Sequence, residues 1–107
     1  MKPRVGNIYD GPKPLEGEDC RELFANPSVK IERIVSRSHA SPPGFWYDQD
    51  EDEWVIVLKG RAVLEFERGE AVSLQEGDYL AIPKHIKHRV RETSEETLWL
   101  AVHAKTE

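Results

Sequence analysis

Residues 53–83 read EWVIVLKGRAVLEFERGEAVSLQEGDYLAIP, and this stretch decides the fold. Short apolar runs alternate in it with turns that contain glycine, and a proline ends the last run. No segment between the runs is long enough for a helix, so the runs predict neighbouring antiparallel strands. The predicted strands are Glu53–Leu58, Ala62–Phe66, Ala71–Leu74 and Tyr79–Ile82.

One further strand is predicted on each side of this stretch. Val29–Val35 alternates apolar and charged residues with one slip, and Thr97–His103 is a final apolar run. The segment Ser41–Gly44 contains two prolines and a glycine, which exclude a helix or a central strand there. The predicted fold class is therefore all-β, an antiparallel sandwich or barrel.

The region before the first strand is rich in proline and glycine. We predict an irregular N-terminal arm at residues 1–28, in which only Glu18–Phe24 could form a helical turn. The barrel is predicted to span residues 29–107.

Length, charge and cysteine content limit the function. The 107 residues fit one domain, and 20 acidic against 15 basic residues give a net charge of -5, which argues against nucleic-acid binding. No apolar run approaches the roughly 20 residues of a membrane-spanning helix, and the first residues lack the apolar core of a secretory signal. The single cysteine, Cys20, has no internal disulfide partner, so we expect a reducing, cytoplasmic location.

The strand at residues 53–58 is apolar on both faces. Val55 and Val57 share a face with Glu53, while Trp54 and Ile56 point to the opposite side. Such a strand lies either in the middle of a two-sheet sandwich or at an interface between subunits. Because a small domain buries a limited share of its surface, we expect a homodimer.

Two polar features could carry chemistry. Residues 48–53 hold five carboxylates, and only Glu53 shares the apolar face, where a carboxylate needs a partner, a metal or access to water. His85 and His88 lie three residues apart after Pro83, and two imidazoles so placed could bind one metal ion. The alternatives are a solvated acidic loop and histidines that serve packing or hydrogen bonding.

The spacing of these residues resembles the two-motif signature of the cupin superfamily. Glu53 precedes Gly60 in the first motif, and Gly77, Pro83 and His88 are in register with the second. The resemblance runs from about Ser36 to His103, two thirds of the chain. It implies a jelly-roll barrel, a double-stranded antiparallel β-helix. Such barrels host many unrelated functions, so the fold does not fix the activity.

The chain departs from the cupin pattern at the two histidines that normally precede the glutamate. Their positions hold either Trp46 and Asp48 or Tyr47 and Gln49, depending on the spacing. By resemblance, the metal ligands would be Glu53 and His88, with Asp48 or Gln49 as an oxygen ligand. His85 or His39 could add an imidazole if its ring turned inward. The ion would be Mn, Fe, Ni or Zn.

Aromatic residues flank the same region and predict a ligand pocket. A small polar molecule could stack on such rings while Glu53 and His88 hydrogen-bond to it. The predicted ligand-binding residues are Trp46, Tyr47, Tyr79 and His85. The alternative is that the aromatic side chains simply close the core.

Two functions follow from these residues. The first is a non-catalytic barrel that binds a small molecule, with a divalent metal at Glu53 and His88 as an optional addition. The second is a metal-dependent enzyme, similar to a dioxygenase or an isomerase, that acts on a small polar substrate.

Overall fold

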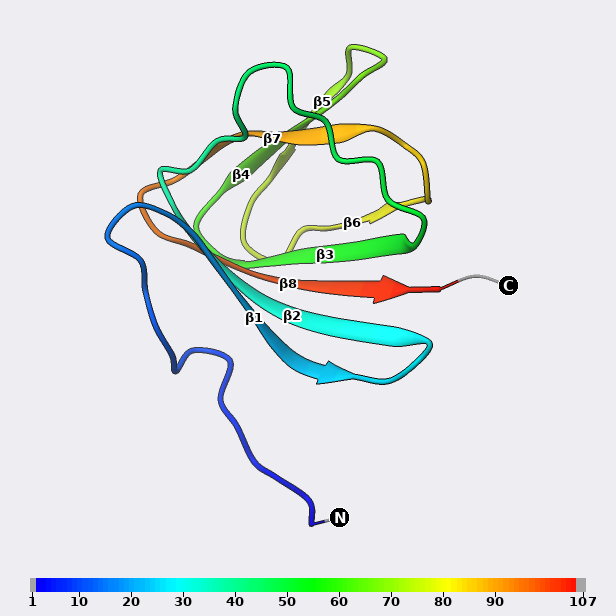
Figure 1. Cartoon of the computed structure of the whole chain (residues 1–107). Helices are drawn as coiled ribbons and strands as arrows, with labels where there is room; N and C mark the ends of the chain where they lie inside the picture. The colour runs from blue at the N-terminus through cyan, green and yellow to red at the C-terminus, as the bar shows by residue number, and fades with distance from the viewer. Residues whose placement is uncertain (1, 106–107) are drawn as a thin grey trace.

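The computed structural model describes residues 2–105 and contains eight strands (Figure 1). They are β1 (Gly17–Ala25), β2 (Val29–Arg37), β3 (Asp52–Lys59), β4 (Ala62–Phe66), β5 (Ala71–Leu74), β6 (Tyr79–Ile82), β7 (His88–Thr93) and β8 (Thr97–Ala104).

The strands form two antiparallel sheets that face each other. The larger sheet has the order β1-β2-β8-β3-β6 and the smaller one the order β5-β4-β7. In Figure 1 the smaller sheet lies above the larger one, and the chain passes between them at both ends. Apolar side chains from both sheets form one core, which includes Val57, Leu64 and Trp99. The arrangement confirms the all-β jelly-roll fold.

Cross-strand register places Glu53 and His103 of the larger sheet on the inner face. Glu53 lies opposite His103 of β8 and Ile82 of β6. Directly opposed residues in a sheet point to the same face. Val55 and Val57 share that face and are almost fully buried, at 3% and 0% exposure, as their alternation predicts.

Six predicted strands are confirmed, each within two residues of its expected ends. The expectation of an irregular arm up to residue 28 is wrong for residues 17–25, because strand β1 pairs with β2 along its whole length. Glu18–Phe24 is therefore extended and not a helical turn. Strand β7 was not expected.

The N-terminal arm, residues 2–16, is fastened to the outer face of the larger sheet by Arg33. Arg33 is 1% exposed, and its guanidinium donates hydrogen bonds to the carbonyl oxygens of Ile8 and Pro12 at 2.7 and 3.1 Å. Lys13 also reaches Glu96 across 2.8 Å. The arm thus covers part of a sheet face that would otherwise meet water.

Another region of that face, over β3, β6 and β8, is open and apolar. Trp54 lies opposite Val102 and Ala81, and its ring contacts that of Tyr79, with centroids 5.5 Å apart. Tyr79 is 66% exposed. We call this region, formed by Trp54, Ile56, Tyr79, Ala81, Leu100 and Val102, the apolar outer surface. Among the described residues no helix could span a membrane.

Candidate functional site

A cavity of about 140 Å³ lies between the two sheets. Its apolar wall comes from both sheets and includes Leu64 and Val90 of the smaller one. Its polar lining consists of Glu18, Cys20, Glu32, Tyr47, Gln49, Glu53, His88 and His103. We call this space the interior cavity.

Glu53 and His88 face each other across the interior cavity. Glu53 lies on β3 and His88 at the start of β7, and Glu53 Oε1 is 3.3 Å from His88 Nε2. The two side chains are 11% and 7% exposed. Glu53 Oε1 is buried and has no hydrogen-bond partner among the described residues. Since a buried acceptor without a donor is costly, Glu53 Oε1 needs either the protonated ring of His88 or a donor from a ligand or water.

The backbone fixes the tautomer of His88. Its Nδ1 lies 2.9 Å from the carbonyl oxygen of Ile86, which accepts a hydrogen bond from Nδ1–H and leaves Nε2 towards Glu53. Burial alone would lower the pKa of His88. The Glu53 carboxylate and the Ile86 carbonyl both favour the protonated ring, and together they raise the pKa above its ordinary value.

The structure also distinguishes between the two residue pairs that could replace the missing histidines, Trp46 with Asp48 and Tyr47 with Gln49. Tyr47 and Gln49 line the interior cavity. Tyr47 forms a two-way backbone bridge with His88, and their rings stack with centroids 5.5 Å apart. Burial is the largest factor that raises the pKa of the Tyr47 phenol, followed by the charge of Glu18, so its hydroxyl is a donor at neutral pH.

His103 closes the cavity on the side of a broad, polar outer depression. Its Nε2 lies 3.0 Å from Glu32 Oε1 and its Nδ1 lies 3.2 Å from Gln49 Oε1. Glu32, Gln49 and His103 line both the cavity and the depression. The other residues of the depression are Lys30, Asp48, Asp50, Glu51 and His85.

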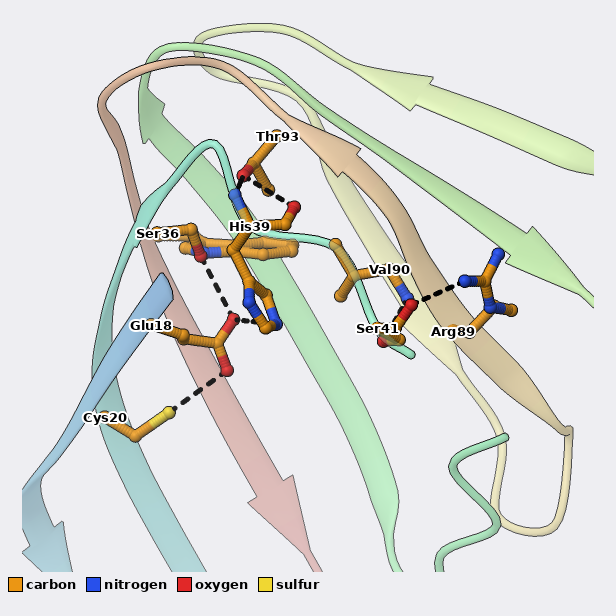
Figure 2. Close-up of polar contacts among 9 residues, drawn as sticks. Glu18, Cys20, Ser36, His39, Ser41, Arg89, Val90 and Thr93 are labelled. Atoms are coloured by element: carbon orange, nitrogen blue, oxygen red, sulfur yellow. Dashed lines mark hydrogen bonds and ion pairs between the residues drawn. The ribbon is translucent and has the colours of Figure 1, made fainter. Parts of the chain in front are cut away.

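Glu18 organises a polar cluster on the β1 side of the cavity (Figure 2). Its carboxylate accepts hydrogen bonds from Ser36 Oγ at 3.0 Å and from the Cys20 thiol at 3.4 Å, and it lies 3.7 Å from His39 Nε2. Burial, followed by the charge of Glu18, raises the pKa of Cys20 to about 12. The thiol is therefore protonated at neutral pH and a poor nucleophile.

The segment that carries His39 is fixed to β7. Figure 2 shows the reciprocal hydrogen bonds between the His39 backbone and the Thr93 hydroxyl, at 2.7 and 2.9 Å. Two residues later, Ser41 Oγ accepts a hydrogen bond from the backbone N–H of Val90 at 3.0 Å. Through these contacts, residues 39–41 connect the two sheets near the Glu18 cluster.

The structure brings only some of the predicted site residues together. Tyr47, Gln49, Glu53 and His88 meet in the interior cavity. Asp48 and His85 lie in the outer depression instead, where Asp48 Oδ1 is 2.9 Å from His85 Nδ1. Trp46 lines neither space.

Tyr79, also predicted to bind ligand, lies on the apolar outer surface. Sequence reasoning missed Glu18 and Glu32, and it left the direction of His103 open. The alternation in β2 held a signal for Glu32, because Glu32 has the same parity as Ile34, which lines the cavity. Glu18 lies on a strand that was not predicted.

The metal set implied by the family resemblance is incomplete in this arrangement. Transition-metal sites in proteins generally use at least three protein ligands. Within residues 2–105, no group of three or more His, Cys, Asp or Glu side chains is arranged to hold a metal ion. Glu53 and His88 supply two ligands, but Asp48 lies outside the cavity and the Gln49 oxygen contacts His103. These residues do not form a metal centre as they stand.

Comparison with known proteins agrees with the geometry. Residues 37–103 match the family model described as "Cupin domain". A Ralstonia eutropha JMP134 protein described as a "putative mannose-6-phosphate isomerase" is 44% identical, with a TM-score of 0.90 over 97% of this chain and 100% of that one. No functionally curated protein matches.

Two more distant structures share the fold. A protein of unknown function from Streptococcus pyogenes is 18% identical, with a TM-score of 0.80 over 100% of this chain and 91% of that one. A cupin superfamily protein from Desulfitobacterium hafniense DCB-2 is 15% identical, with a TM-score of 0.77 over 99% and 94%. At these identities the likeness concerns the fold alone.

Proposed function

We propose that this chain, which belongs to the cupin family, binds a small molecule in its interior cavity. The observation that carries the proposal is the cavity itself, which combines an apolar wall with a convergent group of polar side chains. This combination is typical of small-molecule sites. The buried Glu53 Oε1 supports it, since this atom forms no hydrogen bond of good geometry with His88 and could accept one from a bound donor.

A phosphorylated hexose, the kind of substrate in the description of the Ralstonia protein, fits this cavity poorly. The described residues that line the cavity include no lysine or arginine to neutralise a phosphate. The volume of about 140 Å³ is also close to that of a cavity of about 150 Å³ that holds benzene. The proposed ligand is therefore smaller than a sugar phosphate and lacks the phosphate charge.

A metal-dependent enzyme is the second candidate, and one observation favours it. The Ile86 carbonyl holds the His88 ring with Nε2 towards Glu53, the orientation that a ligating histidine needs. The incomplete ligand set weighs against this candidate.

We further propose a cytoplasmic homodimer that associates through the apolar outer surface.

Thermal unfolding with four small probes tests the proposal. The probes are n-butylammonium, 1-butanol, glycerol and butyrate. A ligand that binds only the folded state stabilises it by about 2.7 kcal/mol at a hundredfold excess over Kd. At least one probe should therefore raise the Tm by several degrees. No shift with any probe would contradict the proposal.

A matched pair of variants locates the effect. Ile34→Phe adds volume to the cavity wall and should abolish the shift. Ile31→Phe makes the same change on the opposite face of β2 and should keep the Tm shift.

For the second candidate, untagged protein should contain about one equivalent of a transition metal. Less than about a tenth of an equivalent, unchanged after incubation with Mn, Fe, Ni and Zn, would exclude it.

A further inference from the structure

We propose that the ligand of the interior cavity is a small alkylammonium cation. The inference rests on the proposed function and narrows it to one class of ligand. Three features of the cavity carry it: the charge balance of its lining, the unsatisfied carboxylate of Glu53, and the apolar wall opposite.

The charges of the cavity lining disfavour an anion. Three carboxylates line the cavity, those of Glu18, Glu32 and Glu53, and each lies within 4 Å of one imidazole. Lys30 also lies 3.9 Å from Glu32 Oε2, but its side chain does not line the cavity. The described lining holds three carboxylates and no lysine or arginine, so with those carboxylates ionised it offers an anion no fixed positive charge. An incoming anion would meet repulsion and no counter-charge.

Glu53 is the carboxylate that a cation would reach. Its side chain is 11% exposed, and its buried Oε1 forms no hydrogen bond of good geometry, although His88 Nε2 lies 3.3 Å away. By contrast, Glu32 is held by His103 at 3.0 Å, and Glu18 accepts from Ser36 and Cys20. An ammonium group carries three donors and a positive charge, so beside a neutral His88 ring it can give Glu53 Oε1 a charge-assisted hydrogen bond.

The remainder of the cavity selects an alkyl tail over a polyol. Leu64 and Val90 line it on the smaller sheet, and Val55, Ile82 and Trp99 line it on the larger one. A hydroxyl group held against this wall would lose its water without gaining a partner. A short hydrocarbon chain would instead bury apolar surface there, which is favourable. An amphiphilic cation therefore fits both walls, and the volume limits it to a few carbon atoms.

The test uses the full chain labelled with ¹⁵N and four probes of similar size, n-butylammonium, 1-butanol, glycerol and butyrate. The reporter is the indole N–H signal of Trp99, because its side chain lines the cavity and its Nε1–H donates to Ser36 Oγ at 3.0 Å. Saturable shifts of this signal give a Kd for each probe. We expect n-butylammonium to bind at least roughly tenfold more tightly than 1-butanol, and butyrate not to bind.

Two variants attribute the preference to Glu53. Glu53→Gln removes the charge and keeps the shape, and it should reduce the affinity for n-butylammonium at least roughly tenfold while leaving that for 1-butanol nearly unchanged. Asp48→Asn removes a carboxylate outside the cavity and should alter neither affinity. The amide spectrum of each variant shows whether it is folded, and the comparison of probes on the wild-type protein does not depend on any variant.

The outcomes separate the two proposals. If 1-butanol, glycerol or butyrate binds as tightly as n-butylammonium, the ligand class is wrong while cavity binding stands. An equal loss of affinity in Asp48→Asn and Glu53→Gln would likewise overturn the assignment of the cation to Glu53. If no probe moves the Trp99 signal, both the cavity function and the ligand class are overturned.

Discussion

His103 Nε2 lies 3.0 Å from Glu32 Oε1, and this contact stands between the interior cavity and the outer depression. The second ring nitrogen of His103 contacts Gln49 Oε1 at 3.2 Å, so the imidazole bridges two side chains that line both spaces. Because this bridge lies between the two spaces, we expect a ligand that enters from the depression to pass His103.

Truncating the bridge should therefore speed ligand exchange. We expect His103→Ala to increase the dissociation rate of n-butylammonium several-fold, because the closed passage becomes an opening. Line-shape analysis of the Trp99 indole signal at half saturation measures this rate. Glu51→Gln changes a residue that lines only the depression and should leave the rate unaltered. Equal exchange rates in His103→Ala and the wild-type protein would argue against this entrance.

Replacing Gly60 by alanine should destabilise the fold more than replacing Gly77, the other glycine of the family signature. Both Gly60 and Gly77 have left-handed backbones, with φ of 84° and 87°. A side chain at Gly60 would collide with the backbone carbonyl of Glu96 and lie 2.6 Å from Ser94 Oγ, whereas no atom lies within 4 Å of the corresponding position at Gly77. Gly77→Ala should cost about 1–2 kcal/mol of unfolding free energy from conformation alone.

Gly60→Ala should cost at least about 3 kcal/mol, because the collision with Glu96 adds to the same conformational penalty. Urea denaturation of the two variants measures the difference. Similar losses in both would mean that the turn at Gly60 can relax away from Glu96.

The pair formed by His88 and Glu53 predicts a pH dependence of stability. The pKa of His88 is raised in the folded state. A raised pKa means that the folded state holds the proton more tightly than the unfolded state, whose histidine pKa is about 6.5. The stabilisation is therefore complete below about pH 6.5 and is lost as the pH rises through the folded-state pKa.

Urea denaturation between pH 5.5 and 8.5 measures this dependence. We expect His88→Gln to lose the part of the pH dependence that lies above pH 6.5, since glutamine does not titrate. An identical pH profile in the variant would show that His88 does not hold the proton. NMR titration of the His88 ring gives its pKa directly and should place it above the ordinary value.

The apolar outer surface should join two copies of the chain. The side chains that form it, Trp54 and Tyr79 among them, carry no charge, so the surface can face its own copy without electrostatic repulsion. We expect the wild-type protein to sediment at twice the 12.3 kDa chain mass and Trp54→Glu to sediment as a monomer. Leu15→Glu, a change at a residue 94% exposed on the arm, is the control and should remain dimeric. A wild-type monomer at tens of micromolar would refute this interface.

Much of the fold could be predicted because the strands from β3 to β6 are short apolar runs separated by turns. Strand β1 could not, because it is a polar edge strand whose stability comes from pairing with β2 and not from its own pattern. Strand β7 could have been predicted from its alternation, because His88 and Val90 line the cavity while Arg89 lies between them in the sequence.

The site was harder to predict, since its residues converge only in three dimensions. In β2 the usual expectation that apolar residues face inwards fails, because Glu32 lines the cavity while Val35 faces outwards beneath the arm. The break in the apolar and charged alternation of this strand comes from the types of its side chains. It does not come from a bulge, because the pairing of β2 with β8 is regular. No local pattern reveals that a distant arm covers the opposite face.

Intermolecular nuclear Overhauser effects between n-butylammonium and the ¹³C-labelled protein test most directly whether the ligand occupies the interior cavity. We expect contacts from the butyl chain to the methyl groups of Leu64 and Val90, which line the cavity from the smaller sheet. Contacts confined to Val102 and Trp54 on the apolar outer surface, with none to Leu64 or Val90, would contradict it.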